Sequence, residues 1–345
     1  MRRTVIAPLV ALGLVVAVAA PALACAGLVA PNGSVRLTRT ATLAGYHDGI
    51  EHYVTSFEFK GGGAKFGSIV PLPDVPSKVT RGGKWTLQRL QRETQPPQPV
   101  AESAGEPASA PAAPAEELYE TEIDGLLITI LKGGSRAVGK WAKKEGFALT
   151  PDAPEVLRFY AQRSQIFMAA RFIPEKARDE EKLQEGDGVP IHLRIPTDNP
   201  WVPLRILALG KRPYQDVNAD VYLLTDDQPA LLPTPVQAGS NRGMVLERSE
   251  EASDLLLDDL RSDRGMKWIP EEMWLTYLRI EMNARNLTYD LAVDASGAGA
   301  PSEEDAYGVE EEETEETADE QYLSWIALPI AGAGLLRVLR SRRRA

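Results

Sequence analysis

Apolar and polar positions alternate near the start of the chain, and this pattern predicts a β-hairpin. Its two arms flank His47-Asp48-Gly49, a combination typical of a tight turn. A third short strand is expected to end at Pro71 and Pro73, because proline cannot donate to a strand ladder. The three strands are predicted over residues 35–43, 53–59 and 66–70. A helix is predicted over residues 84–92, with Trp85 among its apolar positions.

After residue 117 the pattern alternates between predicted strands and helices. The strands are expected over residues 123–131, 165–173, 189–195, 204–209, 219–224 and 287–293. Helices are expected over residues 136–145 and 154–163, in a segment opened by Ser249 and in one started by Pro270. Short consecutive strands with a few helices predict the α+β class, with a mostly antiparallel sheet and several packed helices.

The spacing within these segments predicts which faces are buried. Residues 165–173 are apolar on both faces, which predicts a central strand. Residues 189–195 alternate apolar side chains with polar ones such as His192, which predicts a half-exposed strand. The helix after Pro270 is expected to bury Trp274, Tyr277 and Leu278.

Residues 1–24 have the pattern of an export signal peptide. Two arginines precede an apolar stretch, and Ala22-Leu23-Ala24 fits a cleavage site. Cleavage between Ala24 and Cys25 would make Cys25 the first residue of the mature chain. Two alternatives follow for Cys25, a lipid-modified anchor or an ordinary N-terminus with a free or buried thiol. A retained N-terminal anchor is the alternative to cleavage.

Residues 322–340 are predicted to form a C-terminal transmembrane helix. The apolar stretch spans about 26 Å at about 1.5 Å per residue, close to the thickness of a bilayer core. Aromatic residues are expected at its outer end and arginines at its inner end, where residues 341–345 would form a basic cytoplasmic tail. The predicted anchor residues are Tyr322, Trp325, Arg337 and Arg340.

Two low-complexity segments are predicted to remain disordered. Residues 295–321 hold 11 acidic residues and no Lys or Arg, which is typical of a solvated stalk. Residues 95–117 hold six prolines among Ala, Ser and Glu, which predicts a disordered excursion. The favoured organisation is one ectodomain over residues 26–294 with a Pro/Ala-rich insertion at 95–117. The alternative is an interdomain linker at the same place.

The composition of the 345 residues excludes several classes of protein. The formal net charge is −11, which argues against a dedicated nucleic-acid binder. The single Cys rules out an internal disulfide framework and any metal site built from several cysteines. An apolar fraction of 43% is high enough for a sizeable core and excludes a wholly disordered chain.

Two motifs look like ligand loops, but each lacks a required residue. Gly134 to Lys140 follow a predicted strand as a phosphate-binding loop would, but Trp141 stands where Ser or Thr must hold Mg²⁺. The spacing of Asp216, Asn218, Asp220 and Asp227 resembles a calcium loop. Val221 occupies the position where that loop needs glycine, so a turn entering a strand is the expected structure.

No other constellation predicts a catalytic, cofactor or metal site. The three histidines, His47, His52 and His192, do not have the spacing of a zinc site and are expected to be exposed. No Gly-x-Ser-x-Gly elbow is present, and Cys25 is remote from the predicted fold. We therefore predict no catalytic residue, no cofactor and no metal.

Four stretches of the sequence resemble one known family. They are residues 53–59 with 66–73, residues 138–147, residues 157–172 and residues 274–291. In this order they resemble the family of exported bacterial proteins catalogued as domain of unknown function 2330. Gly67-Ser68 stands where the family often has an aromatic residue, and this chain has fewer cysteines. The resemblance implies an extracytoplasmic location and implies no activity.

These observations lead to one leading functional hypothesis. We expect a membrane-anchored extracytoplasmic protein that acts as a non-enzymatic binding or interaction module of the bacterial cell envelope. The membrane would be contacted by a single C-terminal span, with the ectodomain outside and the C-terminus in the cytoplasm. An envelope protein or a cell-wall component is the expected partner, and nucleic acid is not. The alternatives are an envelope hydrolase built from dispersed carboxylates and an accessory subunit of a membrane complex.

Overall fold

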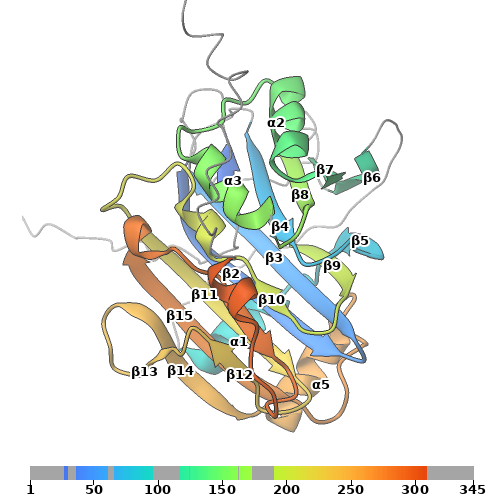
Figure 1. Cartoon of the computed structure of the whole chain (residues 1–345). Helices are drawn as coiled ribbons and strands as arrows, with labels where there is room; N and C mark the ends of the chain where they lie inside the picture. The colour runs from blue at the N-terminus through green and yellow to red at the C-terminus, as the bar shows by residue number, and fades with distance from the viewer. Residues whose placement is uncertain are drawn as a thin grey trace, which may run out of the picture. The chain divides into compact units, whose positions relative to one another are not determined.

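The computed structural model describes most of the chain between residues 27 and 308 (Figure 1). The described residues are 27–29, 36–60, 66–95, 117–123, 125–161, 163–172 and 190–308. They all belong to one compact unit. The predicted cleavage site at Ala24 and Cys25 lies outside these ranges, and so do the predicted anchor residues Tyr322, Trp325, Arg337 and Arg340.

Strands dominate the described part of the chain. They are β1 (Gly27–Val29), β2 (Arg36–His47), β3 (Ile50–Lys60), β4 (Gly67–Leu72), β5 (Lys78–Arg81), β6 (Glu117–Ile123), β7 (Leu126–Lys132), β8 (Ile166–Phe172), β9 (Ile191–Pro196), β10 (Trp201–Val202), β11 (Asp216–Thr225), β12 (Ala230–Leu232), β13 (Val236–Gln237), β14 (Gly243–Glu251), β15 (Trp274–Asn283) and β16 (Leu291–Asp294). The helices are α1 (Thr86–Thr94), α2 (Gly134–Glu145), α3 (Ala153–Ala161), α5 (Asp254–Ser262), α6 (Glu303–Tyr307) and the 3-10 turns η1 (Arg205–Ala208) and η2 (Ala284–Asn286).

Eight strands form the largest sheet, in the order β13-β14-β15-β11-β2-β3-β9-β5. The predicted N-terminal hairpin is confirmed, since β2 and β3 pair antiparallel around the turn at Asp48 and Gly49. Positive φ angles at both turn residues explain why a glycine stands there. Strand β2 also pairs with β11, and this pairing is parallel. The sheet therefore joins the first long hairpin to a strand from the second half of the chain.

A five-stranded sheet, β1-β4-β8-β7-β6, packs against the large sheet. Strand β8 lies between β4 and β7, which confirms the central position predicted from its apolar faces. Strand β4 continues through Pro71 to Leu72, beyond the predicted end. A small sheet, β10-β16-β12, completes the strand layers. The predicted packing of α2 is confirmed, because Val138 and Trp141 are buried beneath it.

The core lies mainly between the two large sheets. Its apolar cluster combines Tyr53 and Val79 from before the predicted insertion with Ile128 and Leu193 from after it. The opposite face of the eight-stranded sheet packs against α1 and α5, and the outer face of the five-stranded sheet packs against α2 and α3 (Figure 1). The layers therefore follow the order helix, sheet, sheet, helix.

Some predicted elements were wrong. The segment after Pro270 forms strand β15 instead of a helix, because it pairs with β14 on one side and with β11 on the other. From Leu278 to Asn283 buried apolar residues alternate with less buried polar ones, as is typical of a strand. The predicted strand over residues 204–209 is the short turn η1. In α5, Leu255 is exposed, and the buried residues are Leu256, Leu257 and Leu260.

The predicted fold class was also wrong. The chain was expected to be an α+β domain with several packed helices and a C-terminal transmembrane helix. The described residues instead form a sheet-rich structure whose helices are short additions to its outer faces. No helix within the described ranges has the length and apolar character that crossing a membrane requires. The predicted span at residues 322–340 lies outside those ranges.

The start of the predicted acidic stalk is described, and it is folded. Residues 303–307 form α6, which Ser302 caps by accepting a hydrogen bond from the backbone N–H of Asp305. Ala306 is buried, and its backbone carbonyl accepts from the N–H of Asp290. This contact with the segment preceding β16 places Asp305 beside the site described next.

Candidate functional site

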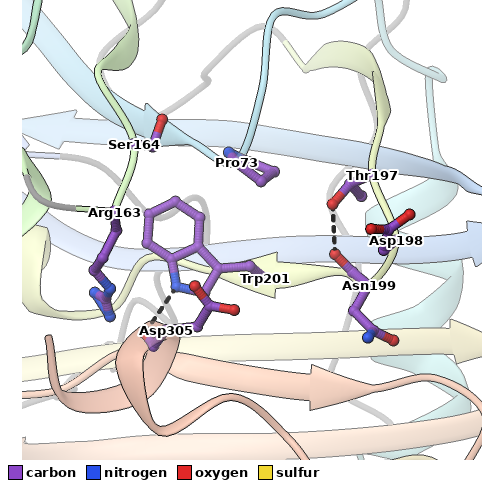
Figure 2. Close-up of a pocket in the computed structure, with 8 residues that line it drawn as sticks. All are labelled: Pro73, Arg163, Ser164, Thr197, Asp198, Asn199, Trp201 and Asp305. Carbon is purple, nitrogen blue, oxygen red and sulfur yellow. Dashed lines mark hydrogen bonds between the residues drawn. The ribbon is translucent and has the colours of Figure 1, made fainter. Parts of the chain in front are cut away.

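A small polar hollow lies beside the indole ring of Trp201 (Figure 2). Its volume is about 240 Å³. Four segments distant in sequence contribute its lining residues: Pro73, Arg163, Ser164, Thr197, Asp198, Asn199, Trp201 and Asp305. Figure 2 shows Arg163 and Ser164 on one side of the indole ring and Thr197, Asp198 and Asn199 on the other.

The loop before Trp201 is fixed by hydrogen bonds from other elements. The hydroxyl of Tyr46 donates to the backbone oxygens of Thr197 at 3.1 Å and Asp198 at 2.6 Å. The backbone N–H of Ala295 donates to Asn199 Oδ1 at 3.1 Å. The indole N–H of Trp201 donates to the backbone oxygen of Asp305 at 3.2 Å, drawn as a dashed line in Figure 2. The wall of the hollow is therefore held in place before any ligand binds.

Arg163 follows the end of α3 and supplies a guanidinium group to the hollow. Its side chain is only 2% exposed, and Nη1 lies 3.0 Å from Asp290 Oδ2. The guanidinium carbon lies 4.2 Å from the ring centre of Phe159 and 5.2 Å from that of Trp201. Among the described residues, its Nε and Nη2 groups have no hydrogen-bond partner. Arg163 thus carries unused donors, which is uncommon for a buried polar group.

Asp290 is the buried counter-ion of Arg163. Its Oδ1 accepts from Tyr160 Oη at 2.9 Å and from the backbone N–H groups of Leu204 at 2.8 Å and Arg205 at 2.7 Å. Burial raises the pKa of Asp290 to about 6, and the charge of Arg163 and these hydrogen bonds oppose that rise. Asp290 therefore connects α3 to η1 and to the segment before β16.

Glu51 is a second buried carboxyl near the same loop. It lies in β3 opposite Tyr46 and is fully buried. Burial raises the pKa of Glu51 well above its ordinary value, and the backbone N–H of Trp201 opposes the shift. Neither carboxyl oxygen makes a hydrogen bond of normal geometry within the described residues. Burial therefore favours the neutral form of Glu51.

The prediction that the histidines are exposed was wrong for two of them. His52 and His192 are buried, and His52 Nδ1 lies 3.0 Å from His192 Nε2. The ring of His52 stacks on Trp268 with 3.9 Å between the ring centres. Burial, together with the smaller effect of neighbouring basic groups such as Arg194, lowers the pKa of His52 to about 3 and that of His192 to about 4.

The polar face of β9 is covered, which explains this error. The segment after α5 covers His192, since a Cβ atom at Gly265 would lie 3.2 Å from His192 Nδ1, and Trp268 of the same segment stacks on His52. His47 is partly exposed and its Nδ1 lies 2.8 Å from Asp226 Oδ1. Among the described residues, no group of three or more His, Cys, Asp or Glu side chains could hold a metal ion.

The residues of the hollow were missed by sequence reasoning, although one signal was present. Arg163 and Asp290 both lie within stretches that carry the family resemblance, and Asp290 is a charged residue beside the apolar run Leu291 to Val293. Their pairing depends on how α3 packs beside β16, which no local pattern reveals. The aspartates of the calcium-like spacing are elsewhere: Asp216 begins β11 and Asp220, buried, accepts from the hydroxyl of Tyr277.

Residues 18–293 match the family described as an uncharacterized protein conserved in bacteria, domain of unknown function 2330. The chain belongs to this family. The match covers the segments that form the hollow except for α6, so the hollow is made largely of family sequence. A comparison with curated proteins found no match.

Two solved structures of a viral protein also show similarity to this family member. The crystal structure of baculovirus P35 has a TM-score of 0.35 and 8% sequence identity, covering 73% of this chain and 97% of that one. A mutated baculovirus P35 after caspase cleavage has a TM-score of 0.36 and 7% identity, covering 72% and 93%. TM-scores below 0.5 do not establish a shared fold.

Proposed function

We propose that this protein is a non-enzymatic binding module of the bacterial cell envelope and that the hollow beside Trp201 is its binding site. The observation that carries the proposal is the hollow itself, in which Arg163, Asp198 and Asp305 from three distant segments line one concave polar site. Charged side chains that converge on a concave site favour a small polar ligand.

The chemistry of the hollow favours binding over catalysis. The described residues that line it include no histidine or cysteine, so no ordinary nucleophile and base pair is available there. Thr197 Oγ1 donates to the backbone oxygen of Asn199, and Ser164 Oγ accepts from the N–H of Ile166. Both hydroxyls therefore serve the local structure and are not activated by a base.

The envelope location rests on the sequence. The pattern of residues 1–24 supports export, and the family resemblance implies an extracytoplasmic protein. A binding module in that location would meet cell-wall fragments, envelope proteins and small solutes. Periplasmic or surface fractionation of cells that produce the full chain tests this point, and recovery of the protein only in the cytosol would contradict it.

Binding is tested with a defined probe, the muropeptide mixture released from digested bacterial cell wall. We expect the mixture to raise the melting temperature of the protein. Thr197→Phe would fill the hollow and abolish the shift. Val236→Phe adds the same ring at an exposed position of β13 and should keep it. A probe that never shifts the wild-type protein, or shifts both variants equally, would overturn the hollow as the site.

A second candidate function is an envelope hydrolase, and one observation favours it. The carboxylates of Asp198 and Asp305 line the same hollow as Arg163, so titratable groups converge on one concave site. The discriminating measurement is turnover of the muropeptide mixture, followed by mass spectrometry. Product formation that Asp198→Asn or Asp305→Asn abolishes would establish the hydrolase, whereas binding without turnover favours the module.

A further inference from the structure

We infer that the solvent-facing side of α2 docks on the surface of an anionic lipid membrane through a stripe of basic side chains. The basic stripe consists of Arg136, Lys140 and Lys143 on α2 and of Lys132 at the end of β7, and all four residues are exposed. The stripe is independent of the hollow beside Trp201 and adds a second surface to the protein.

The basic side chains of α2 lie on one side of the helix. The steps from Arg136 to Lys140 and from Lys140 to Lys143 are four and three residues, and side chains at these spacings are neighbours on a helix surface. Val138 and Trp141 are buried on the opposite side of α2. The helix is therefore amphipathic, with its apolar side against the sheet and its basic side toward solvent.

The charges of the basic stripe are not neutralised within the described part of the chain. None of its four residues forms an ion pair with another described residue. Glu145, the one acidic residue of α2, has Oε2 at 2.8 Å from Arg171 Nε. In the neighbouring helix α3, Glu155 Oε1 lies 2.7 Å from Arg205 Nη2. The stripe is thus a local excess of positive charge on a protein whose formal net charge is −11.

The place of α2 in the layers lets a flat surface reach the basic stripe. Helix α2 covers the outer face of the five-stranded sheet, so it belongs to the outermost layer on that side (Figure 1). A helix with its side chains is about 10 Å thick, and the Debye length at physiological salt is about 8 Å. Carboxylates of the deeper layers are therefore largely screened from a surface that contacts the stripe.

The chemistry of this side of α2 suits lipid headgroups. The negative surface potential of an anionic bilayer attracts Lys and Arg side chains that lie close to it. No large apolar side chain of α2 is exposed, so the contact would stay at the headgroups without insertion into the acyl region. A nucleic-acid strand would instead favour exposed aromatic side chains that stack on its bases, and Trp141, the one aromatic residue of α2, is buried.

A membrane is also the surface that the sequence predicts for this protein. The predicted span at residues 322–340 would hold the full chain at a bilayer, so the basic stripe would act at high effective concentration. Weak electrostatic contact would then be enough to set the orientation of the folded domain on the membrane.

The experiment is a lysine footprint of the full chain on vesicles of two compositions. One set is phosphatidylcholine alone, and the other is phosphatidylcholine and phosphatidylglycerol in equal parts. Exposed lysines are acetylated and quantified by mass spectrometry. We expect the acetylation of Lys132, Lys140 and Lys143 to fall at least about threefold on the anionic vesicles only, and about 0.5 M salt to remove this protection. Lys78, exposed elsewhere, should react equally in all samples.

The comparison of the two vesicle compositions separates the basic stripe from the predicted span. A span would insert into both kinds of vesicle, whereas the stripe needs negative headgroups. The same reactivity of the stripe lysines on neutral and anionic vesicles would overturn the inference. Protection of Lys78 equal to that of the stripe would also overturn it, because it would show that the protein binds through no particular face.

Charge variants separate the basic stripe from the net charge. The stripe variant carries three substitutions on α2: Arg136→Gln, Lys140→Gln and Lys143→Gln. The matched variant removes the same number of charges from exposed positions elsewhere: Arg92→Gln, Arg212→Gln and Lys267→Gln. Lys132 should lose its protection in the stripe variant and keep it in the matched variant, while circular dichroism shows the same fold for both. Equal protection of Lys132 in the two variants would overturn the inference.

Soluble polyanions test other occupants of the basic stripe. Polyglutamate and a single-stranded oligonucleotide, each at the charge concentration of the anionic vesicles, should protect the stripe lysines much less than the vesicles do. Equal protection by either one would assign the stripe to a soluble polyanion and overturn the membrane inference. Thr197→Phe fills the hollow and should leave the footprint unchanged. A missing footprint together with retained binding of the muropeptide mixture would overturn only this inference and leave the proposed function standing.

Discussion

Two buried polar clusters in this protein differ in how they accommodate ionisable side chains in the interior. The Asp290 cluster (Asp290, Arg163 and Tyr160) keeps opposite charges in the interior and joins them with several hydrogen bonds. The histidine cluster (His52, His192 and the indole of Trp268) holds two basic side chains that share a single close contact and a stacked ring. The first cluster borders the hollow, and the second lies under the layer of α1 and α5.

The difference between the two clusters shows which surroundings allow a buried side chain to stay ionised and which favour its neutral form. Asp290 accepts hydrogen bonds from three donors besides Arg163, and these compensate much of the cost of burying its charge. Among the described residues, no carboxylate acts on either histidine to favour the charged form, and the neighbouring positive groups oppose protonation. The Asp290 cluster therefore keeps its charges at a cost that Arg163 and the hydrogen bonds reduce, whereas the histidine cluster avoids that cost because both rings stay neutral.

The largest expected effect comes from breaking the charge pair. Asp290→Asn keeps the shape of the side chain but leaves Arg163 buried without its counter-ion, which we expect to lower the free energy of unfolding by about 3–5 kcal/mol. Chemical denaturation at pH 7 measures the change. Asp216→Asn removes a partner of Arg242 from an exposed pair and should cost less than about 1 kcal/mol. Equal losses in both variants would contradict the contrast.

The second-largest effect is expected from acid, which should lower the contribution of the histidine cluster to the free energy of unfolding. Both histidines have a folded-state pKa below the unfolded value of 6.5, so their contribution is present above pH 6.5 and is lost as the pH falls toward 4. We expect each histidine to contribute a slope of up to about 1.4 kcal/mol per pH unit in that range. His192→Gln should flatten the dependence of the unfolding free energy on pH. An unchanged slope in His192→Gln would contradict the assignment.

Between pH 4 and 7, Asp290 should change the free energy of unfolding with pH in the direction opposite to the histidines. Its folded-state pKa of about 6 lies above the unfolded value of 3.8, so its contribution is present at low pH and is lost as the pH rises through 6. Comparison of the wild type with Asp290→Asn between pH 4 and 7 isolates this term. The stability difference between the two proteins should depend on pH in the direction opposite to that seen for His192→Gln.

A smaller effect is expected from crowding the stacked indole. A Cβ atom at Gly45 would lie 2.3 Å from Trp268 Cη2, so Gly45→Ala forces the ring away from His52. We expect a loss of about 1–3 kcal/mol, typical of overpacking in a core. A thermal melt that matches the wild type would show that the ring moves freely, and the stacked arrangement would then not be a tight constraint.

The matched control for Gly45 has the smallest effect and the opposite sign. Gly139 lies inside α2, and a Cβ atom there would meet nothing within 4 Å. Gly139→Ala should therefore stabilise the protein by about 0.5–1 kcal/mol, because alanine favours the helix over glycine. Destabilisation in the same thermal melt would indicate a contact at this face of α2.

Local patterns predicted much of the strand and helix content. The β2–β3 hairpin, the central strand β8 and the buried face of α2 all follow from spacing that a few neighbouring residues define. Strand β15 was predicted as a helix because Trp274, Tyr277 and Leu278 also fit helical spacing, although the alternation from Leu278 to Asn283 is typical of a strand. Two periods can therefore fit one segment, and here the pairing with β14 and β11 decides between them.

The candidate site could not be predicted in the same way. Asp290 and Arg163 become partners only after α3 packs beside the small sheet, and the hollow draws its lining from four distant segments. His192 was predicted to be exposed because its strand alternates, but α1, α5 and the segment carrying Trp268 cover the polar face. The only local signal for this site was Asp290, a charged residue directly before the apolar run Leu291 to Val293.

The parallel pairing of β2 with β11 has a consequence for how the chain reaches this structure. The edge of the N-terminal hairpin stays open until a strand from the second half arrives, so the large sheet depends on contacts between residues far apart in sequence. Such contacts slow folding and expose strand edges to other chains in the meantime. The protein should therefore be produced and studied as one piece, because either half alone would present an unpaired edge and tend to aggregate.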